Sequence, residues 1–66
     1  MDPNFKEAWF NKGLALNNQS NYGEAIVCYD KALELEPNDK KAWYNKGNAL
    51  DSQEDYDKAI YAMIRR

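Results

Sequence analysis

The side chains of this sequence that could do chemistry are eleven carboxylates and one thiol, and its 66 residues include no histidine. Histidine is the commonest metal ligand and the commonest general base at neutral pH. Several carboxylates could suggest a metal site, but they follow no metal-binding loop spacing, and helix caps and solvated faces explain them: Glu34, Glu36, Asp39, Asp51, Glu54, Asp55 and Asp57. No nucleophile–base pair or phosphate-binding loop is present. We therefore expect no enzyme, no bound metal and no cofactor.

The thiol belongs to Cys28, which has no second cysteine for an intrachain disulfide. It stands between Ala25 and Ala32 on an expected helix, where a free cysteine commonly behaves as a small hydrophobic residue. A reactive role is the alternative. We interpret Cys28 as a residue at the edge of a helical core.

The charges are scattered and nearly balanced, with nine basic and eleven acidic residues and a net charge of −2. There is no basic stripe of the kind that neutralises nucleic-acid phosphates, and no apolar run approaches the ~20 residues that span a bilayer. The first residues lack the positive and apolar regions of a signal peptide. We expect a soluble, cytoplasmic protein that binds neither nucleic acid nor membrane. A chain this short buries only about 60% of its surface, so we expect stabilisation from a partner chain.

The elements that position these side chains follow from an internal repeat. The stretch EAWFNKGLAL at 7–16 returns as KAWYNKGNAL at 41–50, a period of 34 residues. When residues 6–32 are paired with residues 40–66, twelve of the 27 positions are identical. A period of this length is typical of stacked helical repeats, which bury their apolar faces against one another.

Each copy has apolar residues at the i, i+3/i+4, i+7 spacing of a helix, in two runs separated by polar residues. We expect no strands and four helices, at roughly 6–19, 22–36, 40–53 and 56–66. Asn21 and Glu24 predict a capping box at the start of the second helix. Pro37 ends that helix, and Asn38 or Asp39 is expected to cap the next one.

These features resemble the tetratricopeptide repeat (TPR) family, whose pattern has an aromatic residue, a glycine four positions on, small residues in the second helix and a closing proline. In the first copy the matching residues are Trp9, Gly13, Leu16, Tyr22, Ala25, Tyr29, Ala32 and Pro37. In the second copy they are Trp43, Gly47, Leu50, Tyr56, Ala59 and Met63. The resemblance implies an all-α fold of antiparallel helix-turn-helix repeats in an α-solenoid. It divides one domain, 1–66, into the tail of a preceding repeat, a first repeat and a truncated second repeat (1–5, 6–39 and 40–66).

The resemblance also implies a protein-interaction module that binds a protein or peptide in a concave groove lined by the first helix of each repeat. The groove candidates are Glu7, Phe10, Asn11, Leu14, Asn17, Asn18, Lys41, Tyr44, Asn45, Asn48, Asp51 and Ser52. Asparagine amides could pair with a peptide backbone, and Phe10 and Tyr44 could form an aromatic platform. Alternatively, Asn11 and Asn45 fit the repeat pattern and face water. A carboxylate clamp is not expected, because Phe10 and Leu14 stand where the resemblance places Lys and Asn.

The turn inside the second repeat allows two interpretations. The first turn reads NNQSNYG and the second DSQEDYD, which contains neither glycine nor proline. Ser20 and Glu54 stand where the family commonly has glycine. We expect an ordinary turn capped by Asp55. The alternative is one continuous helix, favoured by Gln53 and Glu54, that could donate its last segment to a second chain.

The second repeat is expected to be incomplete, which would leave the apolar face of Ile60, Met63 and Ile64 partly exposed. We therefore expect a homo-oligomer, a dimer, formed by stacking of open ends or by domain swapping. The competing functional class is a purely structural self-assembling element with no separate ligand.

Overall fold

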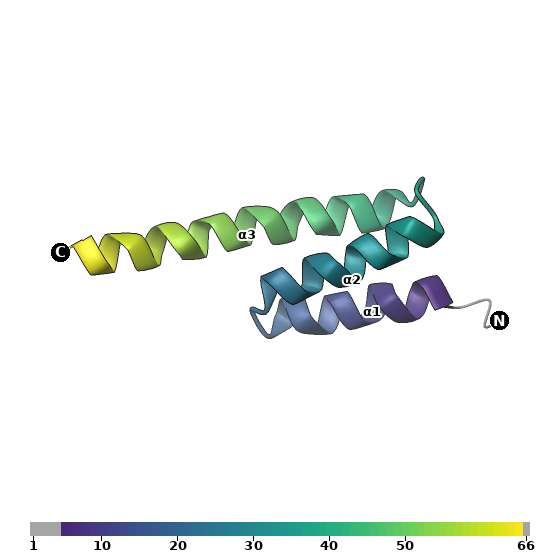
Figure 1. The fold of residues 1–66 in the computed structure, drawn as a ribbon, viewed down its shortest axis with the longest axis horizontal. Coiled ribbons are helices and arrows are strands. Elements are labelled where there is room, and N and C mark those ends of the chain that lie inside the picture. Colours follow the sequence, from purple (N-terminus) through teal and green to yellow (C-terminus); the bar gives the residue numbers. More distant parts are fainter. Residues whose placement is uncertain (1–4, 66) are drawn as a thin grey trace.

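The computed structural model describes residues 5–65, which form the helices α1 (Phe5–Asn18), α2 (Tyr22–Leu35) and α3 (Lys40–Arg65) (Figure 1). No strand occurs in that stretch, so the expected all-α fold is confirmed. Residues 1–4 of the expected preceding-repeat tail, and Arg66 of the expected last helix, lie outside the described residues.

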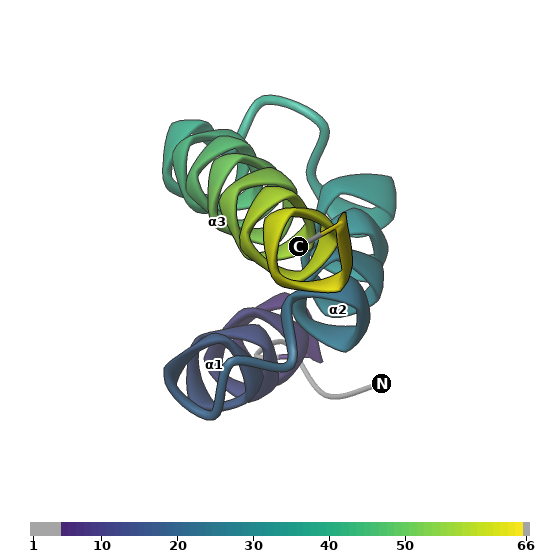
Figure 2. The ribbon, with the colours of Figure 1, turned by 90° about the vertical axis from the view of Figure 1, so that its left-hand side faces the viewer.

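Helix α2 is the central element. It runs antiparallel to α1 and to α3, and it contacts both of them (Figure 1). In the view along the long axis, α1 and α3 lie to the same side of α2 (Figure 2). The buried residues of α2 are Ala25, Cys28, Tyr29, Ala32 and Leu33. The free thiol of Cys28 is thus enclosed, as expected for a packed rather than a reactive cysteine.

The core is centred on Tyr29, whose side chain is fully buried. Around it lie two buried alanines and four partly buried side chains: Ala25, Ala49, Phe10, Leu14, Leu16 and Ile26. Gly13 of α1 faces the Tyr29 ring, and a Cβ atom at that position would lie only 2.6 Å from Cε1 of Tyr29. Glycine inside a helix costs about 0.5–1 kcal/mol relative to alanine. Here that cost is explained by the close approach of α1 to the ring.

The turn between α1 and α2 is closed by its backbone. Ser20 has a φ of 66°, in the left-handed region, and the Asn21 amide donates to the Leu16 carbonyl at 2.8 Å. The predicted capping box is wrong, because the Asn21 side chain makes no capping hydrogen bond to α2. Its amide Nδ2 donates instead to Oε1 of Gln19 at 3.4 Å.

The turn between α2 and α3 is closed by side chains as well as by its backbone, in which the Asp39 amide donates to the Glu36 carbonyl at 3.2 Å. Asp39 Oδ1 accepts hydrogen bonds from the backbone amides of Lys41 at 3.0 Å and Ala42 at 3.4 Å, so Asp39 caps α3 as predicted. The indole Nε1 of Trp43 donates to the carbonyl of Pro37 at 2.8 Å, which ties the turn to the first turn of α3.

Helix α3 is continuous over 26 residues, so the predicted division into helices at 40–53 and 56–66, with a turn capped by Asp55, is wrong. The alternative of a single helix is the observed one. Glu54 stands where the first repeat has Ser20, and the left-handed backbone of Ser20 is unfavourable for a glutamate. Lys58 Nζ lies 3.7 Å from Glu54 Oε2, an i, i+4 pair that a continuous helix permits. The C-terminal half of α3 therefore extends beyond α2 (Figure 1).

Candidate functional site

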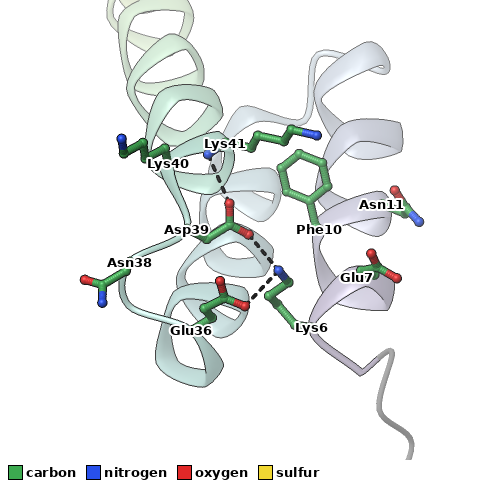
Figure 3. Close-up of a pocket in the computed structure, with 9 residues that line it drawn as sticks. All are labelled: Lys6, Glu7, Phe10, Asn11, Glu36, Asn38, Asp39, Lys40 and Lys41. Carbon is green, nitrogen blue, oxygen red and sulfur yellow. Dashed lines mark hydrogen bonds and ion pairs between the residues drawn. The ribbon is translucent and has the colours of Figure 1, made fainter.

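An open pocket of about 580 Å³ lies between the first turns of α1 and the α2–α3 turn (Figure 3). It is lined by Lys6, Glu7, Phe10, Asn11, Glu36, Asn38, Asp39, Lys40 and Lys41. The Asp39 cap and the Trp43–Pro37 hydrogen bond fix the start of α3 to the α2–α3 turn, and together they form the pocket wall that faces α1.

One side of the pocket is closed by a cluster of opposite charges. Lys6 Nζ lies 3.0 Å from Glu36 Oε1 and 3.1 Å from Asp39 Oδ2 (Figure 3). The hydrogen bond to Glu36, followed by that to Asp39, raises the pKa of Lys6 above its ordinary value. The hydrogen bond from Lys6 is also the main cause that lowers the pKa of Asp39, and the amides of Ala42 and Lys41 act in the same direction. Both groups are thus held in their charged forms, and they join α1 to the α2–α3 turn.

The other side of the pocket is apolar and basic. The Phe10 ring is half-buried and packs against Tyr29, with ring centroids 5.8 Å apart and planes tilted by 48°. Lys41 extends toward this ring, whereas Glu7 and Asn11 project outward from α1 (Figure 3). Lys40 and Lys41 form no ion pair with any residue in 5–65. The pocket therefore combines a fixed aromatic surface with two lysines that lack an acidic partner in this part of the chain.

Comparison with protein families agrees with the two-unit sequence pattern. Two models described as tetratricopeptide repeat match the chain, one over residues 7–39 and the other over residues 28–61. The chain belongs to the tetratricopeptide repeat family. TPRs are non-catalytic repeats that generally mediate interactions between proteins. A search of curated proteins gives no match to this chain.

Two further observations concern membrane-spanning helices and metal-binding side chains in this TPR chain. In residues 5–65, no helix has the length and apolar character that crossing a membrane requires. The same residues contain no group of three or more histidine, cysteine or acidic side chains placed to hold a metal ion.

The predicted groove residues of this TPR divide into three groups. Glu7, Phe10, Asn11 and Lys41 line the pocket. Leu14 packs against the core instead, and Asn17 has a buried Oδ1 with no hydrogen-bond partner among the described residues. The others lie along α3 or at the end of α1, outside the pocket: Asn18, Tyr44, Asn45, Asn48, Asp51 and Ser52.

Asn45 illustrates the alternative that the asparagines only fit the repeat pattern. Its Nδ2 donates to the carbonyl of Lys41 at 2.7 Å, one turn back in the same helix. That donor is therefore engaged within α3, whereas the Asn11 side chain forms no such hydrogen bond with another residue in 5–65 and lies at the pocket rim (Figure 3). The two asparagines, which occupy equivalent positions in the repeats, thus differ in their surroundings.

Sequence reasoning did not assign Lys6, Glu36, Asn38, Asp39 or Lys40 to a site, although all five line the pocket. Lys6 and Glu36 are 30 residues apart, and only the packing of α1 beside the α2–α3 turn brings them together. The one signal in the sequence was the internal repeat, which places Lys6 and Lys40 at equivalent positions 34 residues apart.

The residues predicted for self-association lie on the extending part of α3. Ile60, Met63 and Ile64 are 41%, 72% and 76% exposed. Gly47, the counterpart of Gly13, has no atom within 4 Å of the position that a Cβ would take. Tyr44 and Leu50 on the same helix are also exposed. Helix α3 therefore presents exposed apolar residues outside the pocket, which differ in chemistry from the residues that line it.

Proposed function

We propose that this TPR chain is a protein-interaction module that binds an extended peptide in the pocket between α1 and the α2–α3 turn. The observation that carries the proposal is the Phe10 ring, which Tyr29 holds in place beside Lys41, a lysine with no acidic partner in residues 5–65 (Figure 3). An apolar side chain of the ligand would pack on Phe10, and an acidic side chain would lie near Lys41 (Figure 3).

The Asn11 amide at the rim has both a donor and an acceptor and would pair with the peptide backbone. The Lys6 cluster would act differently. Because two carboxylates already neutralise Lys6, it fixes the pocket wall rather than attracting the ligand. The ligand is thus expected to be apolar and acidic, and its binding should weaken as salt screens the lysines.

A peptide-display selection on the purified chain tests the proposal. We expect enrichment of peptides that pair an aromatic or aliphatic residue with Asp or Glu. Affinity is then measured by fluorescence anisotropy, and Lys41→Glu should weaken the selected peptides at least fivefold. Lys31→Glu is the matched control, because Lys31 is exposed on α2 and does not line the pocket. Equal binding to wild type and Lys41→Glu would contradict the proposal.

A second candidate function is self-association through α3, which the exposed Ile60, Met63 and Ile64 favour. The first product would be a homodimer, formed either by stacking of the apolar ends or by exchange of the last segment of α3. Light scattering on a sizing column at increasing concentration measures this directly. A monomer at every concentration would remove the second candidate and leave peptide binding untouched.

The two candidates can also be separated within an oligomer. A binding module keeps the pocket accessible when it assembles, whereas a purely structural element covers it. Hydrogen exchange and chemical footprinting of Phe10, Asn11, Tyr44 and Asn45 would distinguish these outcomes. Protection of all four on assembly would favour the purely structural alternative.

A further inference from the structure

The first repeat contains an internal template for helix docking. In the α1–α2 hairpin, Gly13 receives the ring of Tyr29, and the same antiparallel register sets Leu16 opposite Ile26. Ala25 lies beside them and is completely buried. A small residue on one helix thus accepts a large side chain from the other.

The second repeat has residues equivalent to both sides of this contact, but in α3 the two sets do not touch each other. The positions equivalent to Gly13 and Leu16 are Gly47 and Leu50, which with Tyr44 form an exposed surface on the N-terminal half of α3, here called the Gly47 surface. The positions equivalent to Ala25, Ile26 and Tyr29 form the Met63 surface on the C-terminal half: Ala59, Ile60 and Met63. All six residues are exposed.

The continuous helix prevents the two surfaces from meeting within one chain. Gly47 and Met63 are 16 residues apart on α3, a separation of roughly 24 Å at 1.5 Å per residue. At 3.6 residues per turn, their side chains also point in directions that differ by roughly 160°. The Gly47 surface and the Met63 surface therefore lie on nearly opposite sides of a straight rod.

We infer that the Gly47 surface of one chain binds the Met63 surface of a second copy, with Met63 seated on Gly47 as Tyr29 is seated on Gly13. The inference rests on the self-association proposed above and names its partner and register. The occupant is argued from continuity with the α1–α2 interface, because the second copy brings the same residue types in the same spacing. Residues 59–63 of that copy would lie antiparallel to residues 44–50 of the first.

The angle between the two surfaces determines the stoichiometry. In a closed two-fold dimer of straight α3 helices, one partner would have to lie on both sides of the rod at once. The contact is instead head-to-tail, so a dimer keeps one unused Gly47 surface and one unused Met63 surface, to which further copies can bind.

The small area of the contact determines its strength. Burial of Tyr44, Leu50, Ile60 and Met63 removes roughly 400 Å² of accessible surface at one contact, well below the ~1,200 Å² of stable interfaces. The association is weak and is expected at roughly 0.1–1 mM protein.

Two variants with complementary defects test the inference on the whole chain. Gly47→Leu blocks one surface and Met63→Asp the other, and both changes are at exposed positions, so circular dichroism should show unchanged helix content. We expect the wild-type mass in light scattering to rise past that of a dimer as concentration increases. Each variant alone should remain a monomer, with association weakened at least tenfold. An equimolar mixture should form a dimer and nothing larger, because only one intact contact remains.

The competing arrangements give different results. Lys58→Asp is the matched control, since Lys58 is exposed and its side chain leaves α3 in a direction that differs by roughly 140° from that of Met63. A dimer that Ile64→Asp abolishes but Met63→Asp does not would overturn the inference and leave self-association standing, by stacking of ends. A wild-type mass that stops at the dimer would overturn the head-to-tail arrangement. A monomer at all concentrations would remove both this inference and the proposed self-association.

A cysteine pair checks the register. In a Cys28→Ala background, Gly47→Cys with Met63→Cys should oxidise to a ladder of disulfide-linked chains on a non-reducing gel. Cysteines bridge only when their Cα atoms are about 4.4–6.8 Å apart, so the pair cannot close within one continuous α3. A monomeric, internally bridged product would show that residues 56–65 fold back in the same chain, which would overturn the inference.

Discussion

The α1–α2 hairpin and helix α3 carry two copies of one repeat, identical at twelve of 27 paired positions, and use them differently. In the hairpin, Gly13 contacts the buried Tyr29, whereas in α3 the equivalent Gly47 faces open space and Met63 is 72% exposed. The residues that build the two surfaces are similar, so they do not account for the difference. The turn between them does: NNQSNYG closes the first repeat, and DSQEDYD continues as helix. We therefore expect that a few turn residues decide whether an apolar face is buried within its own chain.

The most direct way to break this contrast is to replace residues 51–57 with the sequence of residues 17–23. The graft supplies the residues that close the first turn and should end α3 near residue 53. Residues 56–65 would then fold back on the Gly47 surface, and small-angle scattering should show the 52 Å long axis shortened by roughly 15 Å. Alanine at positions 51, 52 and 55 is the control that preserves the helix. An unchanged long axis in the graft would place the cause outside the turn.

The next largest effect is expected when the two large side chains are truncated. Tyr29→Ala should lower the free energy of unfolding by about 3–5 kcal/mol, because it leaves a cavity at the centre of the core. In dilute solution, Met63→Ala should change it by less than about 0.5 kcal/mol, as is usual for exposed positions. Urea denaturation at low micromolar concentration measures both. Similar losses at the two sites would mean that Met63 is buried in the monomer.

The two glycines should respond with opposite signs. A Cβ at position 13 would overlap the Tyr29 ring, so Gly13→Ala should cost about 1–3 kcal/mol through overpacking. At position 47 there is space, and Gly47→Ala should raise the free energy of unfolding by about 0.5–1 kcal/mol through better helix propensity. Thermal unfolding of the dilute proteins gives both values. A loss at Gly47 would indicate that something already occupies its surface.

The smallest expected effect compares the two helix caps. Asp39→Ala should cost about 1 kcal/mol, because Asp39 accepts hydrogen bonds from the start of α3, while Asn21→Ala should cost a few tenths. The Asp39 contribution also depends on pH. Its folded pKa is below the ordinary 3.8, so this stabilisation is present above about pH 4 and is lost as pH falls through the lower folded value. Asp39→Asn should flatten the decline of stability below pH 4, and a decline as steep as that of the wild type would contradict the assignment.

Much of the fold followed from local sequence. The apolar spacing predicted α1 and α2 to within one residue at each end, and Asp39 is one of the two residues, Asn38 and Asp39, that were predicted to cap α3. The two errors occurred at turns. Asn21 has the right residue type for a cap, but the left-handed Ser20 and the backbone hydrogen bonds close that turn without its side chain. Residues 53–56 include acidic side chains that suit both a helix cap and a helix interior. The chain continues there as a helix, and Glu54 is a residue unsuited to the left-handed backbone that Ser20 adopts in the first turn.

The candidate site was less accessible from sequence. The repeat register placed Glu7, Phe10, Asn11 and Lys41 on one surface, and these four line the pocket. The Lys6–Glu36–Asp39 cluster could not be predicted, because it depends on the angle at which the α2–α3 turn meets α1. Whether the remaining residues, such as Tyr44 and Asn48, contact a ligand stays a prediction that peptide binding must test.

The extension of α3 has a consequence for how the molecule rotates in solution. A body of 52 × 19 × 13 Å turns faster about its long axis than end over end. Helix α3 runs along that axis (Figure 1), and the backbone N–H bonds of a helix lie nearly parallel to the helix axis, so their NMR relaxation should report the slower rotation. A uniform relaxation profile along Lys40–Arg65 would show that the extending half of α3 moves as one piece with the half that packs on α2.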